Sequence, residues 1–308
     1  MDHSALLADI VEQVRPLAHQ GQVADYIPAL ARVQPGAVGL ALATLDGQCH
    51  LAGDAQTRFS MQSISKLFAL TLAMQRVGDG LWQRVGREPS GTRFNSLIQL
   101  EHENGIPRNP FVNAGALVVV DALCRRSVQP EFAVLQFLHR LLGTAAVQVD
   151  DSVAQSERTH SHRNAAIAHF MKSFGNLESE VDVVLDAYCR QCAIAISCGE
   201  LASAALFLAG DGVAPDGTRI LSALDARRVN AMLLTCGAYD AAGEFAFRIG
   251  LPVKSGVGGG ILAIVPGVGA LCAWSPTLDR NGNSIAAAAA LERFVAVTGV
   301  SVFAARGS

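Results

Sequence analysis

The sequence has few lysines and few tyrosines. Three of its 308 residues are lysine, against 21 arginines, and three are tyrosine, against 13 phenylalanines. The arginines are scattered and the formal net charge is −3, so we expect no nucleic-acid partner. The one uncharged run longer than the ~18 residues that a membrane-spanning helix requires, residues 255–278, is broken by glycines and by Pro266 and Pro276 into short strand-like pieces, so we expect no membrane span. These shortages argue against a membrane protein and against a nucleic-acid-binding protein.

A secretory signal and a metal-binding pattern are also missing. The first apolar stretch, residues 5–14, is interrupted by Asp9 and Glu12 and reads as an amphipathic helix. Cysteines are odd in number, seven, and mostly have apolar neighbours, which favours free thiols in a cytoplasmic protein. The pair Cys189 and Cys192 has no second pair at zinc spacing. We therefore expect no metal, no cofactor and no export.

Strand patterns occur at both ends of the chain, and helical patterns occupy its middle. Short apolar runs at 37–43, 48–52, 244–249, 253–256, 260–265 and 269–274 predict strands. Helical spacing is found at 4–18, 64–77, 112–124, 131–142, 164–174, 181–193, 197–209, 224–234 and 283–298. The predicted fold is α/β (α+β): an antiparallel sheet from the N- and C-terminal segments, flanked by helices, with an inserted all-helical domain. We place the sheet domain at 1–75 plus 236–308 and the insertion at 76–235.

Two of the three lysines lie in short motifs. Ser63 and Lys66 form a Ser-x-x-Lys, the only such spacing in the chain, with apolar neighbours that indicate burial. On a helix the two side chains share one face, a turn apart. A buried lysine has a lowered pKa, so its neutral amine can take the serine proton and make the serine a nucleophile. Most such pairs elsewhere are solvated surface features, so the motif alone decides nothing.

The second motif is Lys254-Ser255-Gly256, followed by Val257 and three glycines. Alone it also reads as a glycine-containing edge strand. Ser-x-x-Lys paired with a late Lys-Ser/Thr-Gly is nevertheless typical of serine acyl-transfer enzymes of the penicillin-recognising type. Because the chain mostly chooses phenylalanine for packing, its tyrosines Tyr26, Tyr188 and Tyr239 point to hydrogen bonding or proton transfer, although a residue at the core margin is a common alternative.

Several segments together resemble the serine-dependent glutaminase family over nearly the whole chain. They are residues 23–28, 59–66, 108–116, 156–157, 163–164, 188, 235–240, 243–246 and 254–260. So many pieces in the family's order are more specific than either lysine motif. The chain resembles the short bacterial form without appended ankyrin repeats. The resemblance implies a β-lactamase-like fold, metal-free hydrolysis of L-glutamine to L-glutamate and ammonia, and a homotetramer or dimer.

The resemblance also assigns roles to individual residues. Ser63 becomes the nucleophile of a glutamyl-enzyme ester and Lys66 its general base. Substrate contacts map onto Ser63, Asn113, Glu157, Asn164, Tyr188, Tyr239 and Val257. The chemistry of glutamine agrees with this set: Glu157 can pair with the ammonium, the two asparagines can hydrogen-bond, and tyrosine hydroxyls can bind the carboxylate.

The reacting carbonyl needs two donors aimed at its developing oxyanion, and the N–H groups of Ser63 and Val257 are the natural pair. Lys66 can return its proton to the departing ammonia through a tyrosine, with Tyr26 and Tyr239 as candidates. Lys254 would help to keep Lys66 neutral and is counted among the catalytic candidates.

Two alternatives stay open from the residues themselves. One is another Ser-x-x-Lys amidase or acyl hydrolase of β-lactamase or peptidase type. It is weakened because no Ser-Asp-Asn or Tyr-x-Asn lies between the two lysine motifs, and because no export signal is seen. The other is a binding module without catalysis, which the intact Ser63, Lys66 and Lys254 disfavour.

Overall fold

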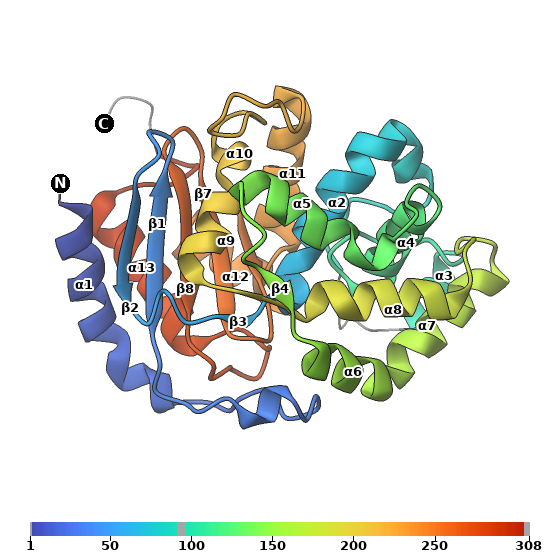
Figure 1. The fold of residues 1–308 in the computed structure, drawn as a ribbon, viewed down its shortest axis with the longest axis horizontal. Coiled ribbons are helices and arrows are strands. Elements are labelled where there is room, and N and C mark those ends of the chain that lie inside the picture. Colours follow the sequence, from blue (N-terminus) through green and yellow to red (C-terminus); the bar gives the residue numbers. More distant parts are fainter. Residues whose placement is uncertain (1, 91–96, 305–308) are drawn as a thin grey trace. The chain divides into compact units, whose positions relative to one another are not determined.

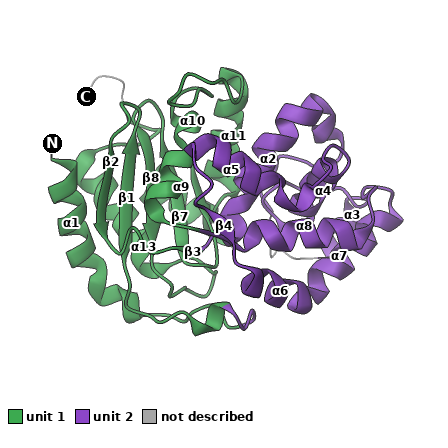
Figure 2. Cartoon of the chain, viewed as in Figure 1, with its two compact units in different colours: residues 1–25, 30–59, 196–308 green, residues 26–29, 60–195 purple. Residues whose placement is uncertain are grey.

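The computed structural model describes residues 2–90 and 97–304, which form two compact units. Unit 1 comprises residues 1–25, 30–59 and 196–308, and unit 2 comprises 26–29 and 60–195 (Figures 1 and 2). The units therefore change at 59/60 and 195/196, whereas the sequence placed the boundaries at 75/76 and 235/236. The segment 196–235 belongs to unit 1 because its first helix, α9 (Cys198–Ala204), packs against strands of that unit.

Unit 1 is built on a five-stranded antiparallel sheet in the order β2-β1-β8-β7-β6. Its strands are β1 (Gly39–Thr44), β2 (Cys49–Gly53), β6 (Val253–Ser255), β7 (Gly260–Val265) and β8 (Gly269–Trp274). The pairing of β1 with β8 joins the two ends of the chain, with Ala41 opposite Cys272. The predicted sheet of N- and C-terminal segments is confirmed.

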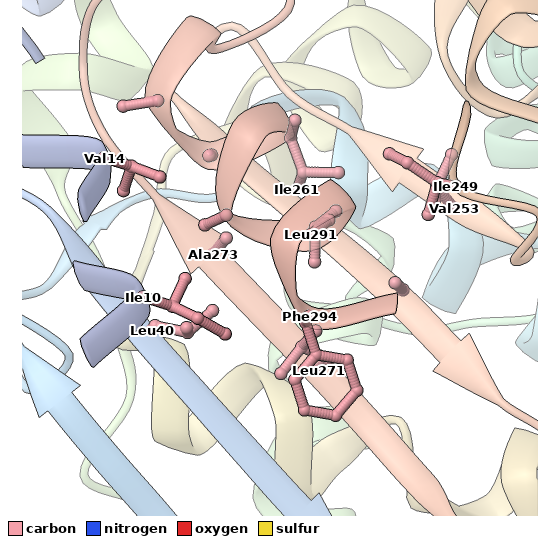
Figure 3. Close-up of a cluster of buried hydrophobic side chains, with 14 of the residues drawn as sticks. Ile10, Val14, Leu40, Ile249, Val253, Ile261, Leu271, Ala273, Leu291 and Phe294 are labelled. Carbon is pink, nitrogen blue, oxygen red and sulfur yellow. The ribbon is translucent and has the colours of Figure 1, made fainter. Parts of the chain in front are cut away.

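Both faces of this sheet are covered by helices, which explains why its central strands β1, β7 and β8 are apolar without alternation. The helices α1 (His3–Val14) and α13 (Ile285–Thr298) contact one face (Figure 1). Their side chains pack with alternate strand residues, including Leu40, Ile261 and Leu271, in the core drawn in Figure 3. The opposite face is covered by α9 and α10 (Leu206–Ala209). In the same unit, α11 (Ala223–Cys236) contacts strand β6.

The run 244–249 was predicted as a strand, and this prediction is wrong. The structure has a helix there, α12 (Ala242–Arg248). Phe245 and Ile249, four residues apart, are buried on one side of the helix, whereas Phe247 is 88% exposed. The alternation of phenylalanines imitated the two-residue period of a strand, but the burial follows the helical period.

Unit 2 is mostly helical, as predicted for the middle of the chain. It contains α2 (Ser65–Val77), α3 (Ile98–His102), α4 (Asn113–Cys124), α5 (Ala133–Leu142), α6 (Asp151–His160), α7 (His162–Ser173) and α8 (Val181–Cys192). The helices α2, α4 and α8 form its centre, since α4 contacts both of the others. Residue 66 on α2 and residue 113 on α4 thereby come within reach of each other.

A short three-stranded sheet accompanies these helices in the order β3-β5-β4. It consists of β3 (Phe59–Ser60), β4 (Gln148–Val149) and β5 (Ile194–Ile196). In the described part of the chain, no helix is long and apolar enough to cross a membrane.

Candidate active site

Ser63 lies in a strained turn that opens the central helix of unit 2. The 3₁₀ turn Gln62–Ile64 leads directly into α2. Gln62 has a left-handed backbone with φ of 47° although it is not glycine, and its side chain is buried. Such strain persists where the surrounding structure fixes it, and it is common beside catalytic groups. Tight turns of this kind present nucleophiles in other hydrolases.

Hydrogen bonds fix this turn to the end of α8. The Ser60 hydroxyl donates to the Cys192 carbonyl at 2.9 Å, and the Met61 N–H donates to the Ile194 carbonyl at 2.8 Å. The Gln62 amide in turn donates to Ser60 Oγ at 3.0 Å. Because Tyr188 lies on α8, one turn before Cys192, these bonds set the approach of Ser63 toward the helix that carries Tyr188.

Lys66 is fully buried and has two hydrogen-bond acceptors. It is 1% exposed. Its Nζ donates to the Phe111 carbonyl at 3.0 Å and to Asn113 Oδ1 at 2.7 Å. It also lies 5.9 Å from the centroid of the Tyr188 ring. The amine is thus held in unit 2 by groups from α8 and from the start of α4.

Burial lowers the pKa of Lys66 from 10.5 to about 8. Electrostatic interactions with Cys192 and Glu157 act in the opposite direction but do not cancel the effect of burial. An amine with this pKa is neutral in roughly a tenth of the molecules at pH 7 and in about half at pH 8. Lys66 therefore has the property that a general base for a serine hydroxyl requires.

Asn113 connects Lys66 to two other predicted site residues. Its Oδ1 accepts from Lys66, and the Tyr188 hydroxyl donates to the same oxygen at 3.5 Å. Its Nδ2 donates to Asn164 Oδ1 at 2.9 Å. The first residue of α4 thus bonds to side chains of α2, α7 and α8. The sequence named all four residues, and the structure brings them together.

Glu157, on α6, is a nearly buried carboxyl. It is 9% exposed, and burial raises its pKa from 4.5 to about 7, against smaller lowering effects of a Gln62 hydrogen bond and the Lys66 charge. Its Oε2 is buried and accepts no hydrogen bond from the described residues. A buried carboxylate oxygen without a partner is costly unless a ligand supplies one. Glu157 is therefore suited to bind a small cation.

Three other predicted residues lie close together in unit 1. Lys254 is 1% exposed and donates to the carbonyls of Gly237 at 2.9 Å and Ser255 at 2.7 Å. Its Nζ lies 4.8 Å from the centroid of the Tyr239 ring, and Tyr239 has a left-handed φ of 53°. Val257 is nearby, because a Cβ on Gly282 would lie 3.5 Å from Val257 and 3.8 Å from Tyr239.

Tyr26 is the most exposed predicted site residue, at 59%. It belongs to the segment 26–29 of unit 2, which is held to α6 where the Ala29 N–H donates to Ser156 Oγ at 3.3 Å. Tyr26 thus lies three residues before Ala29, whose N–H bonds the side chain of the residue next to Glu157.

Among the described residues, no group of three or more histidine, cysteine or acidic side chains is placed to hold a metal ion.

The sequence reading missed the contributions of Gln62, Cys192 and the Phe111 carbonyl. Gln62 and Phe111 do lie inside the resembling segments, but nothing in their residue type marks a role. A backbone carbonyl carries no sequence signal at all. Cys192 is a buried thiol, and burial raises its pKa to about 12, which makes it unreactive.

Comparison with known proteins gives one consistent result. The family model for glutaminase matches residues 21–303. A glutaminase of Paraburkholderia phytofirmans is 59% identical over 304 residues, covering 98% of this chain and 100% of that relative. One from Ralstonia nicotianae is 56% identical with the same coverage.

Solved structures agree with the sequence matches. A Bacillus subtilis probable glutaminase superposes with a TM-score of 0.90 at 33% identity and covers 97% of both chains. Another structure, the probable glutaminase from Bacillus subtilis complexed with 6-diazo-5-oxo-L-norleucine, has a TM-score of 0.89 at 32% identity, covering 98% of this chain and 97% of that one. The predicted β-lactamase-like fold is confirmed by these neighbours. The chain belongs to the glutaminase family, amidohydrolases that convert L-glutamine to L-glutamate and ammonia.

Proposed function

We propose that this enzyme hydrolyses L-glutamine through a glutamyl ester on Ser63, with Lys66 as the general base. The observation that carries the proposal is the state of the Lys66 amine. It is buried, its pKa is lowered to about 8, and its two acceptors are neutral oxygens of Phe111 and Asn113. Ser63 lies three residues earlier, in the 3₁₀ turn Gln62–Ile64 that leads directly into the helix of Lys66.

The proposed reaction has two halves. Ser63 Oγ attacks the side-chain amide carbon as Lys66 takes the hydroxyl proton, and a tetrahedral intermediate forms. The C–N bond then breaks, and the proton passes from Lys66 to the departing nitrogen, so that ammonia leaves and the ester remains. In the second half a water molecule gives its proton to Lys66 and attacks the ester carbon. Glutamate leaves when Ser63 Oγ recovers that proton.

Recognition of free glutamine is proposed to depend on Glu157. The α-ammonium of the substrate would supply the hydrogen-bond partner that Glu157 Oε2 lacks among the described residues. Asn113, Asn164 and Tyr188 are proposed to hydrogen-bond the rest of the amino acid. Charge-assisted bonds between a carboxylate and an ammonium are stronger than neutral ones. A cation pairing with Glu157 also offsets the cost of burying its charge.

For Tyr26, Tyr239, Lys254 and Val257 the predicted roles remain predictions. Tyr26→Phe and Tyr239→Phe each remove one hydroxyl and keep the ring. If one of these tyrosines returns the proton to ammonia, its phenylalanine variant should have a kcat that is lower by roughly 10²–10⁴-fold. Lys254→Met, which keeps a long side chain but removes the charge, tests whether that charge serves catalysis or only holds the Gly237 carbonyl.

The mechanism can be tested with 6-diazo-5-oxo-L-norleucine. Its diazo carbon takes a proton and is then attacked by the nucleophile, so that an O–C bond forms, the C–N bond breaks and N₂ leaves. We expect intact-protein and peptide mass spectrometry to place this adduct on Ser63 in the wild type. The Ser63→Ala variant should show no adduct, and its ammonia release should fall by several decades. An adduct on another residue, or a Ser63→Ala variant that keeps most activity, contradicts the proposal.

Self-association of the enzyme is also proposed, as a dimer or tetramer. Unit 1 exposes Phe247, Val297 and Phe303, with exposed fractions of 88%, 57% and 69%. They belong to one region, because Arg248 on α12 bonds Glu292 on α13 and the Val302 N–H bonds the Gly250 carbonyl. Large exposed apolar groups in one region are typical of interfaces. Light scattering should give a multiple of the chain mass, reduced by Phe247→Asp; a monomeric wild type contradicts this.

A cytoplasmic location is the last part of the proposal. Seven cysteines are free, and burial raises the pKa of the Cys124 and Cys192 thiols to about 12. Reduced thiols are typical of proteins in a reducing compartment. Fractionation of the producing cells should find ammonia-releasing activity with cytoplasmic markers, and recovery outside the cytoplasm would contradict it.

A further inference from the structure

The two acceptors of Lys66 match the donor count of a neutral amine. A charged lysine carries three N–H donors, whereas the neutral form has two and one lone pair. In the described part of the chain, the hydrogen bonds of Nζ go to the Phe111 carbonyl and to Asn113 Oδ1. When both N–H groups are used in this way, the remaining tetrahedral position is the lone pair. The position of the Phe111 carbonyl therefore helps to set where that lone pair points.

The Phe111 carbonyl is held in place by the side chain of Asn109. Asn109 is 1% exposed, and its Oδ1 accepts from the N–H groups of Phe111 at 3.0 Å and Val112 at 3.1 Å. Its Nδ2 donates to the Glu88 carbonyl at 2.8 Å. One buried amide thus ties the turn before α4 to the segment around residue 88. A buried side chain with all these bonds satisfied leaves the turn little freedom.

The packing behind this turn admits little movement. Gly115, in the first turn of α4, lies against the backbone of Asn109, and a Cβ there would approach the Asn109 carbonyl to 1.9 Å. The Pro110 ring also restricts the backbone between Asn109 and Phe111. Asn109 is therefore fixed on one side by close backbone contact and on the other by its hydrogen bonds.

From this geometry we infer that Asn109 is a positioning residue for catalysis, which fixes the Phe111 carbonyl and through it the direction of the Lys66 lone pair. The inference rests on the proposed role of Lys66 as general base and extends it to a residue that does not touch the amine. Nucleophile and base must be held close to a productive geometry, and a misplacement of about 1 Å can cost ~10²-fold in rate.

Other groups also act on the Lys66 amine and must be kept constant. Glu157 and Cys192 interact with it electrostatically, and the Tyr188 ring lies 5.9 Å away. The titratable and charged groups on the elements packed against α2 are Asp79 on the 3₁₀ turn Gly78–Gln83, Asp121 and Cys124 on α4, and His139 and Arg140 on α5. None of these is changed in the experiment below.

The test compares Asn109→Ala with Asn176→Ala at temperatures where both remain folded by circular dichroism. Asn176 is a matched control, since it is also buried in unit 2 and its amide also holds carbonyls, those of Arg84 and Gly105, at 2.8 Å each. We expect Asn109→Ala to lower kcat by roughly ten- to a hundredfold with KM for glutamine nearly unchanged. Asn176→Ala should lower the melting temperature and leave kcat close to wild type.

Rescue separates positioning from a general loss of packing. Asn109→Asp keeps an oxygen that accepts from Phe111 and Val112 and loses only the donor to Glu88. It should recover most of the kcat lost in Asn109→Ala, compared at the plateau of each pH profile because a new carboxylate raises the pKa of Lys66. If Asn109→Ala does not fold, Asn109→Ser replaces it, and the expected order of kcat is wild type, then Asp, then Ser.

Three outcomes of the turnover measurements overturn the inference, in addition to the adduct kinetics described below. They are a folded Asn109→Ala with kcat within about twofold of wild type, an Asp variant no better than Ala or Ser, and an equal loss of kcat in Asn176→Ala. The rate of adduct formation with 6-diazo-5-oxo-L-norleucine separates this inference from the proposed function. A wild type that forms no adduct on Ser63 refutes the Ser63 mechanism itself, whereas unaltered adduct kinetics in Asn109→Ala refute only the role of Asn109.

Discussion

The amine of Lys66 donates a 2.7 Å hydrogen bond to Asn113 Oδ1. The residue that the family resemblance assigns to the substrate is therefore also a direct partner of the proposed general base. The side-chain Nδ2 of Asn113 donates to Asn164 Oδ1. These two hydrogen bonds fix the Asn113 amide with its oxygen toward Lys66. Any change of charge at residue 113 must act on the pKa of Lys66.

Replacement of Asn113 by aspartate should make the enzyme active only at more alkaline pH. A carboxylate next to the amine favours the charged lysine and raises its pKa by ~1–3 units. The acidic limb of kcat/KM should move upward by at least about one pH unit, and activity at neutral pH should fall accordingly. Asn164→Asp places a carboxylate one amide further from the amine and should shift the limb less. If the acidic limb of kcat/KM lay at the same pH in the wild type and in Asn113→Asp, this would argue against Lys66 as the base.

Wild-type activity should rise with pH across the neutral range. The pKa of Lys66 is about 8 and that of Glu157 about 7 in the free enzyme, and the proposed mechanism requires both groups in their deprotonated form. Plots of log kcat/KM between about pH 5 and about pH 9 should climb steeply below the lower of these values and level off above the higher. Maximal kcat/KM near pH 5 would contradict the assigned protonation states.

Glu157→Gln should raise thermal stability at alkaline pH while it abolishes glutamine binding. The pKa of Glu157 is higher in the folded protein than the unfolded value of 4.5. The folded state therefore holds this proton more tightly, and its stabilising effect is lost as pH rises through about 7. Glutamine at position 157 carries no charge and escapes this loss of up to about 3 kcal/mol. The melting temperature of Glu157→Gln should exceed that of wild type at pH 8 and match it at about pH 4, below the unfolded pKa of 4.5.

Glu180→Gln is a suitable control for that measurement, because the Glu180 side chain is 83% exposed in an ion pair with Lys172. Exposed ion pairs contribute little to stability. Its melting temperature should follow that of wild type at both pH values. A Glu157→Gln enzyme that melts below wild type at pH 8 would show that the carboxylate does not destabilise the ligand-free fold.

Asp121 should be required for the stability of unit 2. It is fully buried on α4 and accepts hydrogen bonds from Arg84 at 2.5 Å and from the Ser179 N–H at 2.7 Å. Burial alone would raise its pKa, but the bonds from Arg84, Ser179 and Glu178 lower it overall. Removal of one partner of a buried pair typically costs about 3–5 kcal/mol. We expect this loss for Asp121→Ala in urea unfolding monitored by circular dichroism.

The pH dependence of that contribution follows from the lowered pKa. The stabilisation by Asp121 is present above the unfolded value of 3.8 and is lost as pH falls through the lower folded value. The stability difference between wild type and Asp121→Ala should therefore be constant at neutral pH and shrink in strong acid. Asp182→Asn, at an exposed ion pair with Arg158, should change stability by less than about 1 kcal/mol. A comparable loss at both positions would contradict the special role of Asp121.

The sequence by itself determined much of the local structure. Apolar periodicity predicted the central helices, and the glycine- and proline-bounded runs predicted β1, β2, β6, β7 and β8, because these patterns depend on neighbours within a few residues. The run 244–249 misled for the same reason: its alternation resembles a strand, and only the packing of Phe245 and Ile249 selects the helix. The resembling segments also named Ser63, Lys66 and the residues around them.

Only the tertiary structure decided the chemical state of those residues. The acceptors of Lys66 come from positions 45 and 47 residues away, and one of them is a backbone carbonyl that any residue type would provide. The lowered pKa of Lys66 and the raised pKa of Glu157 both arise from burial, which depends on how helices distant in the chain pack. A charge in water and the same charge in the protein interior differ in free energy by several kcal/mol, and no pattern of neighbouring residues contains that difference.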